Sequence, residues 1–318
     1  MGYGAGVRVV SLLASSTETV CALGFRDALV GRSHECDHPA SVLALPAITW
    51  PKFPYDGTSL EIDQRLKAIL QEGLAVYRVD ADHLARLAPD LILTQTQCEV
   101  CAVSLKDVEG ALADYVGSRP RVVSLEPNRL DDVWRDMQRV AEALGVPARG
   151  EALVAGLRAR MDAIARVARP RVTVAVVEWI DPLMAAGNWM PELITLAGGE
   201  SLFGVAGAHS PWMTFAELAA KDPDVLLVSP CGFDLARTRA EMPVLDGNPA
   251  WTALRAVGEG RVFLADGNQF FHRPGPRLVE SLEILVEILH DGGRRHEGTG
   301  WERYSAKART RSNSPPSR

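Results

Sequence analysis

The sequence of 318 residues has no long apolar run and no recognisable export signal. No segment approaches the ~18–20 consecutive apolar residues that a transmembrane helix requires. The first apolar stretch, Val7–Leu13, has no basic segment before it and no small-residue cleavage site after it. We therefore expect no membrane insertion and, for the chain as given, a cytoplasmic location. A start site further upstream that adds a signal peptide would instead make the protein periplasmic.

The sequence also lacks an excess of positive charge, with 34 Lys and Arg against 40 Asp and Glu. The net charge of −6 argues against nucleic acid as the main partner. A hydrophobic content of 47% with 23% charged residues is typical of a globular protein. Basic residues gather only in residues 293–318, where no apolar periodicity is present, so we expect a disordered basic tail there.

Motifs of several enzyme classes are missing as well. No phosphate-binding loop follows a predicted strand, and neither a serine nucleophile elbow nor a His-Glu-x-x-His zinc motif is present. The sequence therefore leaves the question of enzymatic activity open and favours a non-catalytic role.

Short β-branched or Leu-rich runs alternate with helical patterns along the chain. This order predicts an α/β fold with mainly parallel sheets covered by helices on both faces. The predicted strands are Arg8–Leu12, Leu91–Thr94, Arg121–Leu125, Val172–Glu178, Val225–Ser229 and Val262–Ala265.

Two passages of similar pattern indicate two lobes. A short helix, a Pro-Asp turn and a buried strand occur at His83–Leu93 and again at Glu217–Leu227. Between them, apolar residues recur every three or four positions in one helix that Pro170 ends. We therefore expect two α/β lobes joined by a single long helix, with a ligand cleft between the lobes. The predicted boundaries are 1–146 for the N-terminal lobe, 147–169 for the helix, 170–292 for the C-terminal lobe and 293–318 for the tail.

Four of the five cysteines follow predicted strands, where ligands of open α/β sheets bind. They are Cys36, Cys98, Cys101 and Cys231. Four thiolates suit Zn²⁺ or an iron–sulfur cluster, so these residues are candidate metal ligands. Two alternatives remain open, namely small hydrophobic residues that pack between the lobes and a redox dithiol at Cys98–Cys101.

Aromatic residues make up only 6% of the sequence, yet several fall in the predicted cleft loops. Such side chains suit the wall of a site for a flat, largely apolar ligand. We expect stacking area from Trp50, Trp212, Phe270 and Phe271, and contact from Arg273 with a carboxylate or amide of the ligand. His272 lies in the same loop and is a further candidate ligand residue.

A series of short motifs over residues 7–290 resembles the class III periplasmic binding proteins, the metal-chelate receptors with a helical backbone, and in particular their vitamin B12-binding branch. The motifs are Arg8–Leu12 with Thr17-Glu18, Gly31–Pro39, Ala47–Trp50, Leu87–Ile92, Leu196–Phe203, Ser210–Trp212 and Arg273–Arg277.

This resemblance implies the same two-lobed fold and contact of a corrinoid with His38, Trp50, Met184, Trp212, Phe270 and Arg273. It also implies docking on a membrane transporter through acidic residues, which Glu200 and Glu61 match. The chain differs from that family in its cysteines and in its lack of a signal sequence, and is expected to form a separate branch.

We therefore predict that the protein binds cobalamin or a related metal chelate in the inter-lobe cleft. The expected partners are this small-molecule ligand and an ABC transporter permease, and no nucleic acid. The alternative is a cytoplasmic metal or iron–sulfur redox protein that uses the four cysteines, with zinc or a cluster as its cofactor.

Overall fold

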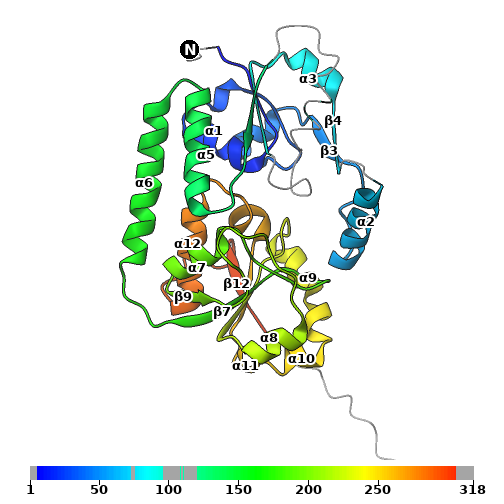
Figure 1. Ribbon diagram of the computed structural model, residues 1–318, viewed down its shortest axis with the longest axis vertical. Coiled ribbons are helices and arrows are strands. Elements are labelled where there is room, and N and C mark those ends of the chain that lie inside the picture. The colour runs from blue at the N-terminus through cyan, green and yellow to red at the C-terminus, as the bar shows by residue number, and fades with distance from the viewer. Residues whose placement is uncertain (1–5, 73–75, 96–107, 109, 111–119, 306–318) are drawn as a thin grey trace, which may run out of the picture.

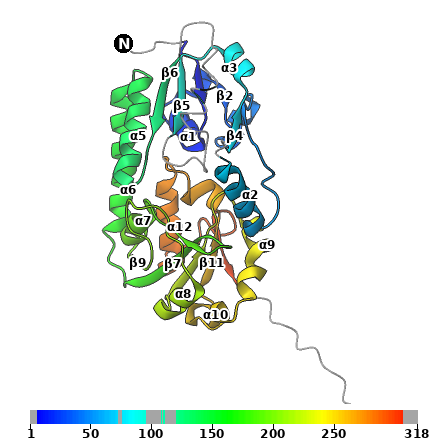
Figure 2. The same ribbon diagram turned by 45° about the vertical axis from the view of Figure 1, so that its right-hand side comes forward.

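The computed structural model describes residues 6–72, 76–95, 108, 110 and 120–305. They form two α/β lobes, and helix α6 (Pro147–Ala165) runs along one side of both, as Figures 1 and 2 show. The predicted two-lobed α/β fold with mainly parallel sheets is confirmed.

The N-terminal lobe contains a parallel sheet in the order β2-β1-β5-β6 and a small antiparallel pair, β3-β4. The strands are β1 (Val9–Ser11), β2 (Leu29–Arg32), β3 (Thr49–Pro51), β4 (Tyr77–Val79), β5 (Leu91–Gln95) and β6 (Arg121–Leu125). The helices of this lobe are α1 (Ala14–Ala22), α2 (Ser59–Gln71), α3 (Ala81–Leu87) and α5 (Leu130–Ala143), with 3₁₀ turns at Arg26–Ala28 and Ala40–Ala44.

The C-terminal lobe has a mixed sheet in the order β12-β11-β10-β7-β8, with β9 also paired to β7. Its strands are β7 (Val172–Trp179), β8 (Met184–Ala185), β9 (Gly199–Ser201), β10 (Val225–Val228), β11 (Val262–Ala265) and β12 (Trp301–Tyr304). Its helices are α7 (Met190–Leu196), α8 (Phe215–Lys221), α9 (Leu235–Asp246), α10 (Pro249–Thr252), α11 (Arg255–Gly258) and α12 (Leu278–His290), with a π-helical turn at Gly267–Phe271.

Strands β10 and β11 are apolar at every position because helices cover both faces of the sheet. All four residues of β10 are completely buried, and alternate residues belong to two different hydrophobic clusters. Val225 and Leu227 face the cluster that includes α12, whereas Leu226 and Val228 face the cluster that includes α8 and α9.

The linking helix ends earlier than the predicted residue 169. Pro147 occupies the first turn, where its missing N–H costs nothing, and Arg166 is the C-cap. Beyond the cap, the guanidinium of Arg169 donates hydrogen bonds to the carbonyl oxygens of Ile164 at 2.7 Å and Val167 at 3.2 Å. These bonds satisfy carbonyl groups at the helix end, so the chain leaves the helix before Pro170.

The prediction of a disordered tail is wrong for residues 293–304. Strand β12 pairs antiparallel with β11 and forms the edge of the sheet. The buried indole of Trp301 donates a hydrogen bond of 2.7 Å to Glu287, and the buried His296 lies 3.1 Å from Glu283. Both acidic residues belong to α12, so the positive charge of this segment is balanced by a helix that precedes it. The remainder, 306–318, lies outside the described residues.

Within the part of the chain that the structure describes, no helix combines the length and the apolar character needed to cross a bilayer.

Candidate functional site

The loops that follow strands β2 and β11 meet across the boundary between the lobes. Arg273, only 6% exposed, donates hydrogen bonds to both carboxylate oxygens of Asp37 and lies 3.5 Å from Glu18 on α1. Arg277 completes this group with two hydrogen bonds to Glu18, at 2.6 and 2.9 Å. The four charges, two from each lobe, form an inter-lobe ion-pair network.

This network has a different role from the one predicted for Arg273. Its guanidinium also donates to the carbonyl of Glu35 at 3.3 Å and to the side chain of Asn268 at 3.0 Å. Because the protein supplies these acceptors, Arg273 joins the lobes here, and the proposed contact with a ligand requires the network to open. Burial opposes ionisation of Asp37, but the hydrogen bonds and charge of Arg273 lower the pKa of that carboxyl.

Glu35 and His34 lie beside this network. The side chain of Glu35 is 40% exposed, yet desolvation by the surrounding protein raises its pKa to about 7 against the opposing charge of Arg273. The neighbouring His34 is half-buried, and desolvation together with the charge of Arg32 lowers its pKa to about 4. In both side chains, desolvation by the protein opposes the charged form.

The lobes also meet at helix α2, which Figure 2 shows beside α9 of the other lobe. The N–H of Ser59 donates to the carboxylate of Glu241, and the Ser59 hydroxyl accepts a 3.1 Å hydrogen bond from the N–H of Asp181. Arg237 of α9 donates to the carbonyl of Gly57 at 3.3 Å. These contacts are polar and lie on the opposite side of the molecule from α6 (Figures 1 and 2).

Two of the predicted aromatic residues are open to solvent. Trp212 is 58% exposed and Trp50 is 36% exposed. The ammonium group of Lys67, from α2, lies 5.4 Å from the centre of the Trp212 ring, which places Trp212 at the boundary between the lobes. The half-buried Met184 forms a backbone bridge with Trp212, so these two predicted residues are neighbours.

The other predicted residues are placed differently. Phe271 is completely buried in the hydrophobic cluster that includes α12, so its prediction as a stacking residue is wrong. Phe270 is also buried in that cluster, although its ring lies 5.4 Å below the guanidinium of Arg277. His38 is exposed beside the ion-pair network, and desolvation together with Arg277 lowers its pKa.

A polar cluster that sequence reasoning did not assemble lies at the carboxyl ends of β7 and β10. The Ser210 hydroxyl donates to both carboxylate oxygens of Glu178, at 2.9 and 3.0 Å. His272 Nε2 lies 2.7 Å from the carbonyl of Ser229, and its Nδ1 lies 3.9 Å from Glu178 Oε2. The rule that ligands bind beyond strand ends pointed to each loop separately, but not to this combination.

A glycine allows the loops of this polar cluster to pack closely. A Cβ atom on Gly267 would lie 2.1 Å from the carbonyl oxygen of Pro230 and 3.2 Å from the His272 ring. Only glycine therefore fits where the turn after β11 crosses the loop after β10, and this crossing places His272 against Ser229.

Comparison with known proteins agrees with this architecture. A family model described as periplasmic binding protein matches residues 9–268. The chain belongs to the periplasmic binding protein family. The vitamin B12-binding protein of Vibrio parahaemolyticus is 20% identical over 289 residues, which cover 88% of this chain and 87% of that protein.

Solved structures share the fold of this periplasmic binding protein. A periplasmic heme-binding protein from Pseudomonas aeruginosa superposes with a TM-score of 0.69 at 22% identity, covering 94% of this chain and 98% of that one. The periplasmic vitamin B12-binding protein of Vibrio cholerae gives a TM-score of 0.61 at 18% identity, covering 88% of this chain and 95% of that one.

The cysteines of this periplasmic binding protein do not gather where the structure describes them. Cys36 is completely buried in the hydrophobic core of the N-terminal lobe and accepts a 3.1 Å hydrogen bond from Thr17. Burial raises the pKa of this thiol to about 12, so in this structure Cys36 packs as a protonated core residue, and its role as a metal ligand stays a prediction. Cys231 is a free, half-buried thiol in the other lobe, and Cys98 and Cys101 lie outside the described residues.

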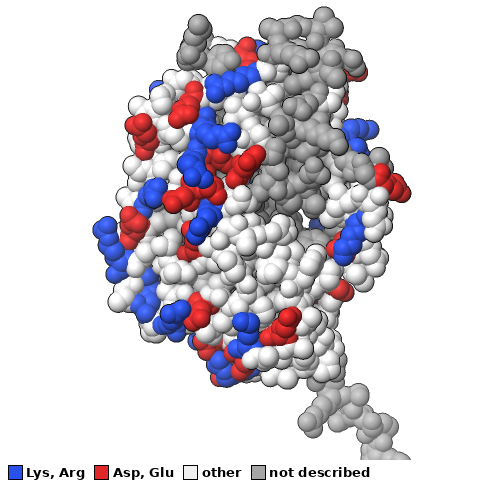
Figure 3. Space-filling view, in the orientation of Figure 1, with Lys and Arg blue, Asp and Glu red and all other residues white. Residues whose placement is uncertain are grey.

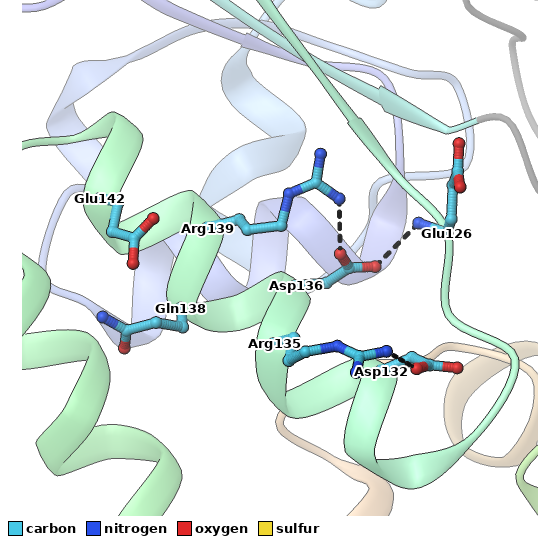
Figure 4. A pocket seen from close by; sticks show the side chains of 7 residues that line it. All are labelled: Glu126, Asp132, Arg135, Asp136, Gln138, Arg139 and Glu142. Atoms are coloured by element: carbon cyan, nitrogen blue, oxygen red, sulfur yellow. Dashed lines mark hydrogen bonds and ion pairs between the residues drawn. The ribbon is translucent and has the colours of Figure 1, made fainter.

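No cluster of three or more potential metal ligands occurs among the residues that the structure describes. A hollow of about 380 Å³ lies instead on the outer face of α5, away from the cleft (Figure 4). Two of its acidic side chains are engaged, since Asp136 binds Arg139 at 3.0 Å and the N–H of Glu126 at 2.9 Å, and Asp132 pairs with Arg135. Figure 3 shows charges of both signs alternating on this side of the molecule, as expected for a solvated surface.

Proposed function

We propose that the protein binds a metal chelate with a flat, largely apolar face, cobalamin or a related corrinoid, in the cleft between its lobes. The role is binding without chemical transformation, followed by delivery to an ABC transporter permease. Membership of the periplasmic binding protein family supports a small-molecule ligand, and the similar proteins from Vibrio and Pseudomonas are named for binding vitamin B12 and heme.

The exposed Trp212 at the lobe boundary is the observation that carries this proposal. A tryptophan that is 58% exposed leaves a large apolar surface in contact with water, beside Met184 and facing α2 of the other lobe. Lys67 is held above the ring by its 2.7 Å ion pair with Asp63. A planar ligand inserted between the lobes would cover the indole and use the electron-rich ring face that Lys67 now occupies.

Two acidic residues remain proposed for docking on the permease. Glu61 is exposed at the start of α2, where hydrogen bonds from the N–H and hydroxyl of Thr58 lower its pKa. Glu200, on β9 of the other lobe, pairs with Arg171 at 3.0 Å. Each lobe therefore presents one carboxylate that is available to basic groups of a transporter.

The proposal is tested by titrating the purified protein with cyanocobalamin, dicyanocobinamide and hemin, with calorimetry as the readout. We expect binding of a corrinoid, and at least a tenfold loss of affinity in Trp212→Ala because a buried aromatic contact contributes about 1.4 kcal/mol or more. The control is Val205→Ala, because Val205 is an apolar residue that is even more exposed than Trp212. This variant should bind as the wild type does. Absence of binding to all three chelates would reject the proposal.

A further inference from the structure

The polar cluster of the C-terminal lobe lies at the carboxyl ends of two neighbouring strands. Strands β7 and β10 are parallel and pair Val177 with Val228, so Glu178 and Ser229 are the next residues in register. Side chains alternate between the two faces of a sheet. Glu178 therefore projects on the same face as Val176, and Ser229 on the same face as Leu227, which is one common face.

The position of the protons in this cluster can be worked out from its hydrogen bonds. The carbonyl oxygen of Ser229 can only accept, so His272 Nε2, at 2.7 Å, carries the proton that it donates. In the neutral ring, Nδ1 is then an acceptor with a free lone pair. This nitrogen faces Glu178 Oε2, a second acceptor, at 3.9 Å. With the ring in this neutral form, no hydrogen lies between the two acceptors, so a group that donates to both can bind there.

Among the described residues, His272 is the basic side chain recorded beside the carboxylate of Glu178. Its side chain is largely buried, and Ser210 supplies its hydrogen bonds through a single hydroxyl group. Among the described residues, no lysine or arginine pairs with Glu178, in contrast to Glu18, which receives both Arg273 and Arg277. A buried carboxylate in this state attracts any group that brings hydrogen-bond donors.

A third polar atom in the cluster has no partner. Ser229 is completely buried, and its hydroxyl makes no hydrogen bond in the described part of the molecule. Buried polar atoms are nearly always satisfied, so one that is not marks a place for a water or a ligand atom. The Ser229 hydroxyl thus has no partner, and beside it Glu178 receives its side-chain hydrogen bonds from the single hydroxyl of Ser210.

A nitrogen with two hydrogens fits this arrangement. Placed ~2.9 Å from each acceptor, a common N–H···O or N–H···N length, one such nitrogen spans the 3.9 Å between Glu178 Oε2 and His272 Nδ1. A ligand carboxylate does not fit, because it brings further acceptors and a negative charge that Glu178 repels. We infer that Glu178, Ser229 and His272 form a subsite for a primary amide of the ligand and select amide-bearing chelates over carboxylate-bearing ones.

This inference rests on the proposed function and extends it to the choice of ligand. Calorimetric titration with two corrinoids tests it, namely dicyanocobinamide, all but one of whose side chains end in primary amides, and dicyanocobyrinic acid, whose side chains end in carboxylates. The wild type should prefer the amide form. In Glu178→Gln, that preference should fall by about ten- to hundredfold, because a charged hydrogen bond is lost and the repulsion of the acid is removed.

Two further variants separate binding from folding. Ser229→Ala removes a hydroxyl that has no partner, so it should weaken binding of the amide form about two- to tenfold while leaving the unfolding temperature unchanged. Glu302→Gln, on β12 at the edge of the same sheet, is the control for loss of one negative charge and should leave the preference intact.

The outcomes distinguish the two proposals. If neither corrinoid binds to the wild type, the proposed function fails. If both bind equally well and neither Glu178→Gln nor Ser229→Ala changes the ratio, the cluster holds only water, and the subsite is refuted while the binding function stands.

Discussion

Replacement of Glu18 by glutamine is expected to destabilise the closed arrangement of the lobes. In the inter-lobe network, two carboxylates face two guanidinium groups, so the described charges sum to zero. Glu18→Gln leaves Arg273 and Arg277 to share Asp37. Removal of one partner from a buried ion pair costs 3–5 kcal/mol, and the partial exposure of Asp37 places this case near the lower end, at about 3 kcal/mol.

Thermal unfolding followed by circular dichroism measures this effect. A loss of 3 kcal/mol lowers the unfolding temperature by roughly 4–5 °C for a chain of 318 residues. The control is Asp131→Asn, which breaks the exposed ion pair with Arg158 and should cost no more than ~0.5 kcal/mol. The double variant Glu18→Gln/Arg277→Gln restores the charge balance and should recover part of the loss.

Small-angle scattering supplies a second readout for the same variant. If the lobes separate so that the unpaired guanidinium groups reach water, the radius of gyration increases and the loss in unfolding temperature becomes smaller. An unfolding temperature equal to that of Asp131→Asn, with an unchanged radius of gyration, would refute the role of the network in holding the lobes together.

Three other predictions concern Glu35, Trp301 and Cys36. The pKa of Glu35 is raised from 4.5 to about 7, so ionisation of this side chain costs stability progressively from pH 4.5 to 7 and fully above pH 7. The stability of Glu35→Gln relative to wild type should therefore be higher at pH 8 than at pH 4.5 in thermal unfolding, and an equal difference would contradict this. Trp301→Ala should cost about 3–5 kcal/mol in urea unfolding, because the buried indole and its bond to Glu287 are lost; a cost below 1 kcal/mol would show that β12 is not anchored. Cys36 should resist alkylation in the folded protein while Cys231 reacts, as peptide mass spectrometry would show, and labelling of both at equal rates would argue against the buried position.

The sequence predicts the fold because its strong signals are local. Val225–Val228 and Val262–Ala265 are continuous apolar runs, and a strand covered on both faces needs such a run. Both strands were therefore predicted to within one residue.

The site is harder to predict because its partners are distant in sequence. Arg273 looks like a free cation in a loop, and its acceptors Asp37 and Glu18 precede it by more than 230 residues. The segment around Trp301 appears too basic to fold until α12 supplies its carboxylates. Charges that are neutralised by residues far away in the sequence leave no local pattern. Composition alone therefore gives a wrong interpretation of both Arg273 and the segment around Trp301.

The polar cluster represents an intermediate case. Glu178 and Ser229 each end a predicted strand, and their shared face follows once the pairing of β7 with β10 is known. Register between parallel strands is set by the packing of the covering helices, which a single sequence does not specify. The burial of Phe271 could not be predicted from the sequence. Its side chain is buried because residues Gly267–Phe271 form a π-helical turn, and no sequence pattern predicts that turn.

Apolar packing joins the lobes on both sides of their boundary. Near α6, Trp134 and Met137 of α5 pack in one continuous hydrophobic cluster with Leu193 of α7. Near α2, Phe233 of the C-terminal lobe is buried in a cluster with Ile62 of α2. Exposure of apolar area costs roughly 25 cal/mol per Å², whereas an exchanged hydrogen bond costs little. Separation of the lobes on either side therefore exposes apolar surface, and these two clusters, rather than the hydrogen bonds between the lobes, set the cost of opening.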